Sequence, residues 1–369
     1  MKVLTIGTDK RIFEDGSATQ RRIISYGAIV EELHIICFTK KGFKEKKISP
    51  NVYVYPTNSI SKIFYITDAL SFSKLFLSKK IDLVSAQDPF ESGFVAFLMA
   101  RNLKAKFYIQ IHTDFLSPYF FKESFLNKIR VMVAKFILPR ADGIRVVSER
   151  IKHSLITSHL PLTAIPVVLP IRATEICEGG NKDFLKKKYP DFDNFILMVG
   201  RLEKEKNVSL AIQSFSEVSE SFQKTALVIV GDGSLKKSLK KEDERLKLKD
   251  KVFFEGWQEE LQNYYLSASI FLHTSHYEGY GLVLFEAGLA GLPIVSTDVG
   301  IAEQMQNSGL AIFIVDSDKM NVSDVIKKEL GALPKARENA LEGKEILLKT
   351  LISEEEYLKR YKIAWEKCL

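Results

Sequence analysis

Two glutamates stand eight positions apart in HTSHYEGYGLVLFEAGLAGLP (residues 273–293), a stretch otherwise rich in glycine and apolar residues. Glu278 lies in a loop before a predicted helix, and Glu286 lies about one turn inside that helix. Gly279 and Gly281 let backbone amides approach a ligand closely, and amides at a helix N-terminus form a site for an anion. A diphosphate bound there would have a carboxylate on either side. Each carboxylate could accept hydrogen bonds from vicinal sugar hydroxyls.

Two cations, Arg201 and Lys206, follow an apolar run at residues 195–200 and precede a predicted helix. If that run is a strand of a parallel sheet, both side chains lie at its carboxyl end, where ligands bind in doubly wound sheets. They could neutralise a diphosphate and stabilise negative charge on a departing nucleoside diphosphate. The cations and the two glutamates could instead be solvated or helix-dipole residues. The position of the cations after a buried strand favours the functional interpretation.

Short apolar runs alternate with longer helical patterns along the whole chain, and most of these runs are continuous rather than alternating in polarity. Strands covered by helices on both faces have this pattern, so the runs predict parallel sheets. About ten strands with helices between them predict two doubly wound α/β domains. The expected strands are residues 2–7, 34–39, 81–86, 106–112, 143–148, 195–200, 226–231, 251–256, 270–275 and 293–298.

The chain has 369 residues, which is longer than one hydrophobic core usually supports. Residues 165–194 contain prolines, a Gly-Gly pair and no clear period, so the division between domains is expected there. We expect domains over 1–170 and 171–345, followed by a C-terminal helix within 346–369. That helix is expected to begin after an N-cap at Ser353, with a run of glutamates that suits the helix dipole.

Composition and charge restrict the class of protein. The chain is 46% hydrophobic and 27% charged, and its three cysteines form no disulfide or zinc spacing. With no apolar run long enough to cross a bilayer, we expect a cytoplasmic protein. The net charge is +7, and residues 1–180 hold 26 Lys/Arg against 16 Asp/Glu. This basic half could face a membrane surface or a phosphorylated acceptor, or could simply be solvated; no motif that reads nucleic acid is present.

Residues 119–138, YFFKESFLNKIRVMVAKFIL, predict one basic amphipathic helix, because apolar residues recur at helical spacing among lysines and an arginine. Such a helix could bind the surface of an anionic membrane. It could equally pack on its own sheet with the lysines outward. Both interpretations remain open from the sequence.

The sequence gives little support for a metal site. His273, His276 and Glu278 imitate a metal cluster, but they lie on a strand end and a turn rather than on one helical face. Two Asp-x-Asp patterns, at 191–193 and 316–318, suit turn-forming aspartates. We therefore expect no metal and no cofactor.

Four segments in order resemble the retaining GT-B glycosyltransferases of family 4. They are GRLEKEKNV, GDGSLKK, the pair of glutamates in an E-x7-E pattern, and EGYGLVLFEAGLAGLPIVSTDVG. The similarity is strong over roughly 195–305 and weaker over the first half. It implies two Rossmann-like domains that face a cleft, a nucleotide-sugar donor held mainly by the second domain, and a C-terminal helix that crosses back to the first. It implies no Asp-x-Asp metal site.

The resemblance also assigns roles to residues of the second domain. It implies that Arg201 and Lys206 bind the diphosphate, Glu286 the ribose hydroxyls and Glu278 the hydroxyls of the transferred sugar. The remaining donor contacts that it implies come from main chain near the base and at the start of the helix: Gly256, Trp257, Gly279, Gly281 and Leu282.

Two residues of the first domain join this set by resemblance. His112, in IQIHTDF, stands where family members have a histidine that faces the transferred sugar, although a core histidine would also suit a strand end. Gly16, in EDGSATQ, stands where the family has a glycine-rich loop near the donor, and Ser17 replaces the usual second glycine. The implied catalytic residues are thus His112, Arg201, Lys206 and Glu278.

The expected function is a metal-independent retaining glycosyltransferase. It would move a hexose or N-acetylhexosamine from a UDP- or GDP-linked donor to a glycan or lipid-linked acceptor, in the cytoplasm or on the inner face of the membrane. Two alternatives are a nucleotide-sugar epimerase of the same architecture, which would need no acceptor, and a catalytically silent GT-B subunit that binds a partner.

Overall fold

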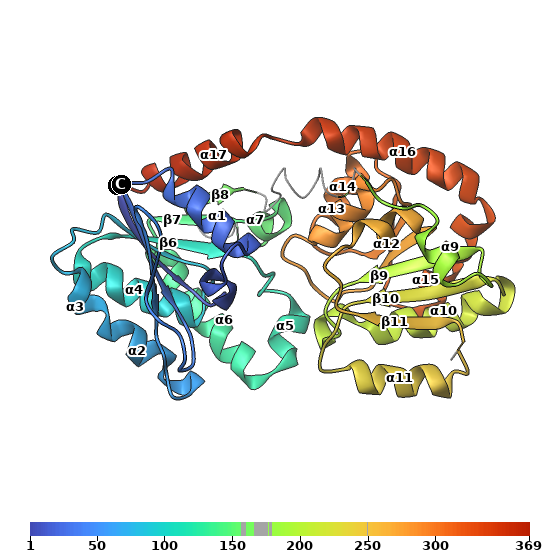
Figure 1. The fold of residues 1–369 in the computed structure, drawn as a ribbon, viewed down its shortest axis with the longest axis horizontal. Coiled ribbons are helices and arrows are strands. Elements are labelled where there is room, and N and C mark those ends of the chain that lie inside the picture. The colour runs from blue at the N-terminus through green and yellow to red at the C-terminus, as the bar shows by residue number, and fades with distance from the viewer. Residues whose placement is uncertain (156–159, 166–175, 177–178, 249) are drawn as a thin grey trace. The chain divides into compact units, whose positions relative to one another are not determined.

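The computed structural model describes residues 1–155, 160–165, 176, 179–248 and 250–369. The chain forms two compact units (Figure 1): Met1–Pro166 with Glu354–Leu369, here called unit 1, and Val167–Ser353, called unit 2. The domain boundary expected near residue 170 falls outside the described residues. Within the part of the chain that the structure describes, no helix is long and apolar enough to cross a bilayer.

Unit 1 is built on one eight-stranded sheet of order β3-β4-β2-β1-β5-β6-β7-β8. All neighbouring strands are parallel except β3, which runs antiparallel to β4 at the edge. The strands are β1 Lys2–Gly7, β2 Glu32–Cys37, β3 Lys46–Ser49, β4 Val52–Pro56, β5 Leu83–Ala86, β6 Lys106–Ile111, β7 Gly143–Val146 and β8 Leu162–Ala164.

Helices connect these strands and cover the sheet. They are η1 Lys10–Phe13, α1 Ala18–Gly27, η2 Lys62–Phe64, α2 Tyr65–Ser71, α3 Ser73–Phe76, α4 Glu91–Leu103, α5 Pro118–Glu123, α6 Phe125–Ile137, η3 Leu138–Arg140 and α7 Glu149–Leu155. Most strand residues are buried on both faces, which is why their sequences are continuous apolar runs.

The last helix, α17 (Glu354–Glu366), belongs to unit 1, as the sequence analysis expected. Its buried face includes Tyr357, Tyr361 and Trp365. The Tyr361 hydroxyl donates to Gln110 of β6 (2.8 Å), and the Tyr357 hydroxyl lies 3.2 Å from a guanidinium nitrogen of the buried Arg145 on β7. A buried polar network therefore attaches the C-terminus to the first sheet.

Unit 2 is built on a six-stranded parallel sheet of order β11-β10-β9-β12-β13-β14. The strands are β9 Asn194–Val199, β10 Thr225–Val230, β11 Val252–Gly256, β12 Ile270–His273, β13 Ile294–Thr297 and β14 Ile312–Val315. Alternate residues of β9 enter different cores: Phe195, Leu197 and Val199 pack on one face, and Ile196 and Met198 on the other. Both faces are therefore covered, as in a doubly wound domain.

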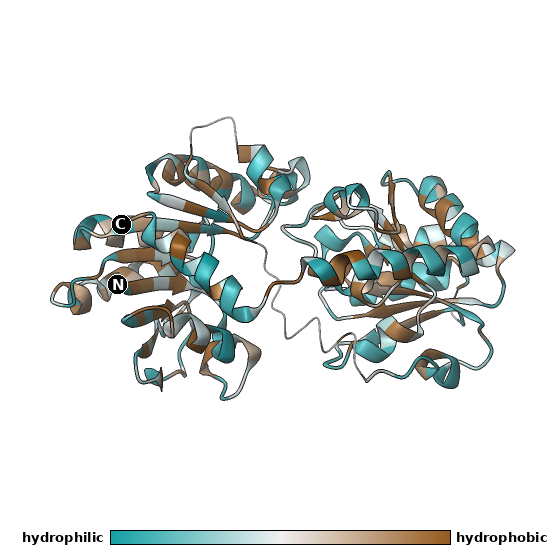
Figure 2. Ribbon diagram, turned by 90° about the horizontal axis from the view of Figure 1, so that it is seen from above, coloured by the Kyte–Doolittle hydropathy of each residue, from teal (hydrophilic) through white to brown (hydrophobic). Residues whose placement is uncertain are grey.

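The helices of unit 2 divide between these faces. Core residues of α12, α13, α14 and α16 pack on the face of Phe195, and those of α10, α11 and α15 pack on the face of Ile196. Figure 2 shows the sheets of both units as mainly hydrophobic ribbons under helices of mixed polarity. The helices are α9 Phe184–Lys188, η4 Lys204–Lys206, α10 Val208–Ser221, α11 Lys236–Arg245, α12 Gln262–Ser267, α13 Leu282–Leu289, α14 Ala302–Asn307, α15 Lys319–Gly331 and α16 Leu333–Thr350.

All ten expected strands are present within two residues of their expected ends. Four further strands, β3, β4, β8 and β14, were not expected. Each has only three to five residues; β3, β8 and β14 are edge strands and β4 lies next to an edge, where a long apolar run is not required. Helix α16 reaches Thr350, so residues 346–350 lie in unit 2 and only α17 joins unit 1.

The expectation of a single helix over residues 119–138 was wrong. The chain forms α5 and α6 there, separated at Ser124. Ser124 is extended (φ −155°, ψ 158°), and its hydroxyl accepts a hydrogen bond from the Asn127 amide at 3.1 Å. Serine competes in this way for backbone groups and is favoured as a helix N-cap, so it begins a new helix rather than continuing the first.

Candidate donor site of unit 2

The loops that follow the strands of unit 2 gather at the carboxyl edge of its sheet, and hydrogen bonds join them. The Thr274 hydroxyl, after β12, donates to the carbonyls of Lys206 and Asn207 at 3.2 and 3.0 Å. The His276 amide donates to the Glu205 carbonyl at 2.8 Å, and Thr297 of β13 donates to the Ser275 carbonyl at 2.7 Å. Hydrogen bonds therefore hold the segments after β9, β12 and β13 together at this edge of the sheet.

Gly200 and Gly231 allow two of these loops to touch. A Cβ atom on Gly231 would lie 1.9 Å from the Gly200 carbonyl oxygen, and the φ of Gly231 is 139°. Beside this contact, the aliphatic part of Lys206 passes within 3.6 Å of the Cβ position of Gly200. The Gly231-Asp232-Gly233 turn thus has a structural role, because only glycine permits this approach.

Glu278 is the centre of the side-chain cluster at this edge. Its Oε1 atom pairs with the Lys206 ammonium, accepts a 2.9 Å hydrogen bond from the Ser275 hydroxyl, and lies 3.2 Å from His273 Nε2. The side chains of Glu278 and Lys206 are each only 13% exposed. The three contacts that described residues make to this carboxylate all reach Oε1, which fixes its orientation.

The charges around Glu278 keep it ionised. Burial by itself would raise the pKa of this carboxyl, but the contact with His273 and the positive charge of Lys206 outweigh burial and lower its pKa to about 2. Burial lowers the pKa of His273, whose side chain is 1% exposed, and the contact with Glu278 offsets this only in part. The site at neutral pH thus contains a carboxylate, an ammonium and a neutral imidazole.

Arg201 lies on the same loop but is much more open. Its side chain is 75% exposed, and a guanidinium nitrogen donates to Glu205 at 2.6 Å. Glu205 is 11% exposed, and its carbonyl is the one that accepts from His276. Arg201 is therefore anchored at the edge while its guanidinium stays accessible to solvent.

Glu286 is buried, at 2% exposure, in the second turn of α13. The Tyr265 hydroxyl of α12 donates to Glu286 Oε2 at 2.8 Å. Glu278 and Glu286 therefore sit in different surroundings: the first belongs to the loop cluster with Lys206, and the second lies between α12 and α13.

The start of α13 depends on Gly281. This residue is the N-cap and has a left-handed backbone (φ 82°), after which Leu282 begins the helix. Gly300, after β13, packs against this loop: a Cβ there would lie 2.3 Å from the Tyr280 carbonyl oxygen and 3.2 Å from Glu278 Cβ. A Cβ on Gly281 would lie 3.9 Å from Glu278 Cγ, so the start of α13 is close to the Glu278 side chain.

Gly256 and Trp257 follow β11 on the same edge of the sheet. Gly256 has a φ of 70°, and its carbonyl accepts from the Gly231 amide at 2.7 Å. Trp257 is 68% exposed. Both residues therefore lie at the same edge of the sheet as Lys206 and Glu278.

Comparison with known proteins gives the family. Residues 31–170 match the model of Glycosyltransferase Family 4, and residues 181–340 match the model of glycosyl transferases group 1. The chain belongs to the GT-B glycosyltransferases of family 4. The two family models correspond to the two units, each of which has the Rossmann-like topology of this fold.

Similar proteins include other glycosyltransferases. An uncharacterized glycosyltransferase of Methanocaldococcus jannaschii is 26% identical over 69% of this chain and 63% of its own length. The alpha-monoglucosyldiacylglycerol synthase of Streptococcus pneumoniae is 26% identical over 62% of this chain and 54% of its own length. This chain thus spans less than two thirds of these two relatives.

Solved structures share the fold over the full chain. The sucrose-phosphate synthase of Thermosynechococcus elongatus has a TM-score of 0.80 at 18% identity and covers 100% of this chain and 99% of its own. HepE of Anabaena, solved with UDP and glucose, has a TM-score of 0.77 at 17% identity and covers 99% of each chain. At these identities the likeness establishes the GT-B fold.

The two unit 1 residues singled out by family resemblance both lie at the carboxyl edge of the unit 1 sheet. His112 follows β6, is exposed, and its Nε2 lies 3.4 Å from Gln110 Oε1. Gly16 precedes α1 with a φ of 74° and open space at its Cβ position, and the Ser17 hydroxyl caps α1 by accepting from the Gln20 amide at 3.1 Å. Capping of α1 therefore explains why a serine stands here instead of a second glycine.

Neither of the Asp-x-Asp patterns, nor the His273–His276 pair, forms a metal site among the described residues, which contain no cluster of three or more His, Cys, Asp or Glu side chains able to hold a metal ion. The Asp318 carboxylate caps α15 by accepting from the amides of Met320 and Asn321. Asp193 pairs with Lys186 at 2.7 Å. Both aspartates are structural.

Three side chains that contact the two glutamates were not predicted in that role. His273 was considered only as a metal ligand, whereas it contacts Glu278; Ser275 and Tyr265 were not singled out. Ser275 lies three residues before Glu278, so its position in the loop was a usable signal. Tyr265 lies 21 residues before Glu286, on another helix, and no pattern in the sequence connects the two.

Proposed function

We propose that this protein is a retaining glycosyltransferase that moves a hexose or N-acetylhexosamine from a nucleotide-diphosphate sugar to a glycan or lipid-linked acceptor without a metal. The observation that carries the proposal is the clamped carboxylate of Glu278. Lys206, Ser275 and His273 all contact Oε1 and thereby leave Oε2 as the acceptor for hydroxyls of the transferred sugar.

The diphosphate would lie between the loop after β9 and the N-terminus of α13. Lys206 contributes a partly buried ammonium and Arg201 an accessible guanidinium, which suits the two negative phosphates. The amides that follow Gly281 add the positive end of the helix dipole. The same groups would stabilise the charge that develops on the departing nucleoside diphosphate, which is the role a metal performs in other transferases. Metal independence rests on this set of cations.

Glu286 would bind the ribose of the donor. It is already held by Tyr265, so its orientation is set before a ligand arrives. The base would lie beside the main chain of Gly256 and near the exposed Trp257. HepE, which shares this fold, is described with UDP and glucose, and this supports a UDP-linked sugar as the first donor to test.

The acceptor side of the proposal rests on unit 1. One relative, by its name, makes a glucosyl diacylglycerol, and another transfers N-acetylgalactosamine to a sugar on diphospho-undecaprenol. These names support an acceptor that is a glycan, a lipid or both. His112, exposed at the carboxyl end of β6, is the residue of unit 1 proposed to face the transferred sugar.

Helices α5 and α6 suit contact with an anionic membrane surface, which we include in the proposal. Seven large apolar side chains on these two short helices are at least 42% exposed: Tyr119, Phe121, Phe125, Leu126, Ile129, Met132 and Phe136. Lys122, Lys128 and Lys135 are exposed among them. Large apolar and cationic side chains mixed on one surface are typical of helices that lie in a membrane interface. A cytoplasmic protein would meet the inner face of the membrane in this way.

The test of the donor site compares two lysines of the same turn. Lys206→Ala should lower kcat/KM by about 100-fold or more, whereas the exposed Lys204→Ala, two residues away on η4, should change it less than twofold. Donor binding would be measured by calorimetry after a thermal-shift screen of UDP- and GDP-sugars. The anomeric configuration of the product would be determined by NMR.

Further variants test the roles of Glu286 and Arg201. Glu286→Ala should weaken donor binding, and Tyr265→Phe should weaken it about fivefold, because the loss of one hydrogen bond costs about 1 kcal/mol. Arg201→Ala should remove most turnover. If Lys206→Ala and Glu286→Ala bind and turn over the donor like the wild type, this site is not the donor site.

A further inference from the structure

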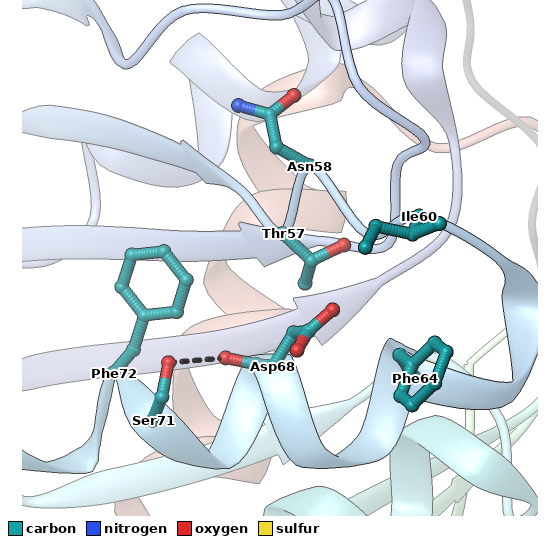
Figure 3. Close-up of a pocket in the computed structure, with 7 residues that line it drawn as sticks. All are labelled: Thr57, Asn58, Ile60, Phe64, Asp68, Ser71 and Phe72. Carbon is teal, nitrogen blue, oxygen red and sulfur yellow. Dashed lines mark hydrogen bonds between the residues drawn. The ribbon is translucent and has the colours of Figure 1, made fainter.

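Unit 1 contains a pocket of about 390 Å³. Its lining includes none of the site residues discussed above. It lies between the loop that follows β4 and helix α2, again at the carboxyl edge of a parallel sheet. This volume is in the range of small-molecule sites. The lining residues, drawn in Figure 3, are Thr57, Asn58, Ile60, Phe64, Asp68, Ser71 and Phe72.

One wall of the pocket is fixed by hydrogen bonds. The Thr57 hydroxyl accepts from the Thr39 amide at 2.9 Å and donates to the Thr39 carbonyl at 3.0 Å. The Asn58 side chain bonds both backbone groups of Phe43, at 2.8 and 3.1 Å. The polar atoms of this wall are therefore engaged in holding the loop, and the wall keeps its shape without a ligand.

Asp68 supplies the pocket's available polar group. No side chain among the described residues pairs with its carboxylate; the Ser71 hydroxyl donates to the Asp68 backbone carbonyl instead, at 2.6 Å. In Figure 3 the Asp68 side chain rises from α2 toward Thr57, with Phe64 and Phe72 on either side. Phe64 is 47% exposed and Ile60 75% exposed, so both offer apolar surface at the rim.

We propose that this pocket binds a sugar residue of the acceptor, which rests on the transferase function proposed above. A carboxylate accepts hydrogen bonds from two neighbouring hydroxyls, and aromatic and aliphatic side chains cover the apolar face of a sugar ring. The charge of Asp68 disfavours a phosphate or an anionic headgroup. Lys62 stands on η2 between the lining residues Ile60 and Phe64, and Lys40 pairs with Ser59 in an isolated parallel bridge; positive charge on both disfavours a cationic ligand.

The strand order indicates where along the acceptor this sugar would stand. β4 stands four places from β6 in the sheet, and β6 leads to His112. With about 4.8 Å between neighbouring strands, the two positions are about 19 Å apart along the edge. One sugar ring cannot extend over that distance. The sugar in the pocket would therefore be remote from the reacting hydroxyl, and the acceptor would be an oligosaccharide rather than a single sugar or a bare lipid.

The test uses the full chain and simple probes. Saturation-transfer NMR would measure binding of the methyl glycosides of glucose, galactose, mannose and N-acetylglucosamine at millimolar concentration. At least one should bind the wild type, and its signal should disappear in Asp68→Asn and fall in Phe64→Ala. The matched control is Asp324→Asn, which changes an exposed aspartate of α15 in unit 2 and should bind like the wild type.

Donor calorimetry on the same samples separates this proposal from the previous one. If UDP- or GDP-sugars bind but no glycoside does, or if Asp68→Asn binds glycosides as well as the wild type, the sugar pocket is overturned and the donor site stands. Preferential binding of tetramethylammonium over every glycoside, lost in Asp68→Asn, would also overturn it in favour of a cation site. If no nucleotide sugar binds at all, the donor site fails instead.

Discussion

Among single residues, Glu278 shows how one carboxylate can be held ionised in a nearly buried place. Its charge is compensated by Lys206, and its orientation is set by Ser275 and His273 through the same oxygen. A buried charge that lacked such partners would shift its pKa and become neutral. The unit thus retains a negative charge at a position from which sugar hydroxyls could be bound.

His273 should make the stability of unit 2 depend on pH. Its pKa is lowered in the folded protein, mainly by burial, so between that value and the usual 6.5 the unfolded chain binds more protons. Stability is then full above about pH 6.5 and falls as pH decreases below it. His273→Asn should flatten the decrease of the melting temperature between pH 6.5 and 5.

The effect of Glu278 lies in a different pH range and does not confuse this measurement. Its folded pKa is lowered to about 2 from the usual 4.5, so its contribution is present above pH 4.5 and is lost only as pH falls toward 2. If the wild type and His273→Asn lose melting temperature in parallel between pH 6.5 and 5, the buried neutral imidazole is not the cause.

Among the elements of unit 2, close contact between loops positions the side chains of the candidate donor site. The turn after β10 touches the turn after β9 at Gly231 and Gly200, and the loop after β13 touches the loop after β12 at Gly300. A side chain at Gly231 would push its turn away from the loop that carries Lys206. A side chain at Gly300 would push its loop away from the loop that carries Glu278. The geometry of the site therefore depends on residues that would never contact the donor.

Gly231→Ala should destabilise unit 2 by at least about 2 kcal/mol, because the added Cβ would overlap the Gly200 carbonyl and the backbone has a positive φ. Gly331→Ala, at the end of α15, is the matched control: nothing lies within 4 Å of its Cβ position, and its φ is not in the left-handed region. Urea denaturation would compare the two. If Gly231→Ala and Gly331→Ala had equal free energies of unfolding, the contact between Gly231 and Gly200 would not contribute to stability.

The exposed apolar side chains of α5 and α6 should contribute to binding of anionic membranes. The double substitution Phe125→Glu and Met132→Glu changes side chains that are 76% and 70% exposed, so folding should be unaffected while affinity for anionic vesicles falls at least tenfold. Vesicles of phosphatidylglycerol and phosphatidylcholine in a flotation assay would measure this. Leu341→Glu, 55% exposed on α16, should float like the wild type. Equal flotation of all three proteins would end the membrane proposal.

At the scale of the whole molecule, the chain leaves unit 1 after β8 and returns to it with α17. The returning helix is held by a stacked pair, Tyr26 and Tyr361, by the hydrogen bond of Tyr361 to Gln110, and by Trp365, which is 1% exposed. Unit 1 can therefore fold completely only after the last 16 residues have been synthesised. The first 166 residues alone would expose the surface that α17 covers.

Trp365→Ala should destabilise unit 1 by about 3–5 kcal/mol, the usual cost of removing a large buried aromatic side chain. Hydrogen exchange followed by mass spectrometry would report the two units separately, with faster exchange expected in β6, β7 and α1 and no change in β9 to β14. Lys362→Ala on the exposed face of α17 is the control. Faster exchange throughout unit 2 would show that the units unfold together.

The sequence alone determined the class of fold, because both sheets are buried on two faces and their strands are continuous apolar runs such as FILMVG and ALVIVG. It also determined which residues stand beyond strand ends: Arg201 directly follows such a run, and Lys206 and Glu278 lie within the segments after β9 and β12. The glutamates at 354–356 located the start of α17. The break between α5 and α6 was not located, because serine also occurs inside helices and the capping role of Ser124 depends on its backbone conformation.

Which of these residues contact one another depends on the tertiary structure. That Lys206 pairs with Glu278, 72 positions away, and that Tyr265 binds Glu286, follows from the order of strands in the sheet and from helix packing. Side-chain type and spacing carry no information on contacts between distant elements, because these contacts depend on how buried surfaces pack. The same reason kept the pocket at Asp68 hidden, as its lining comes from a loop and a helix whose sequences show no pattern of a site.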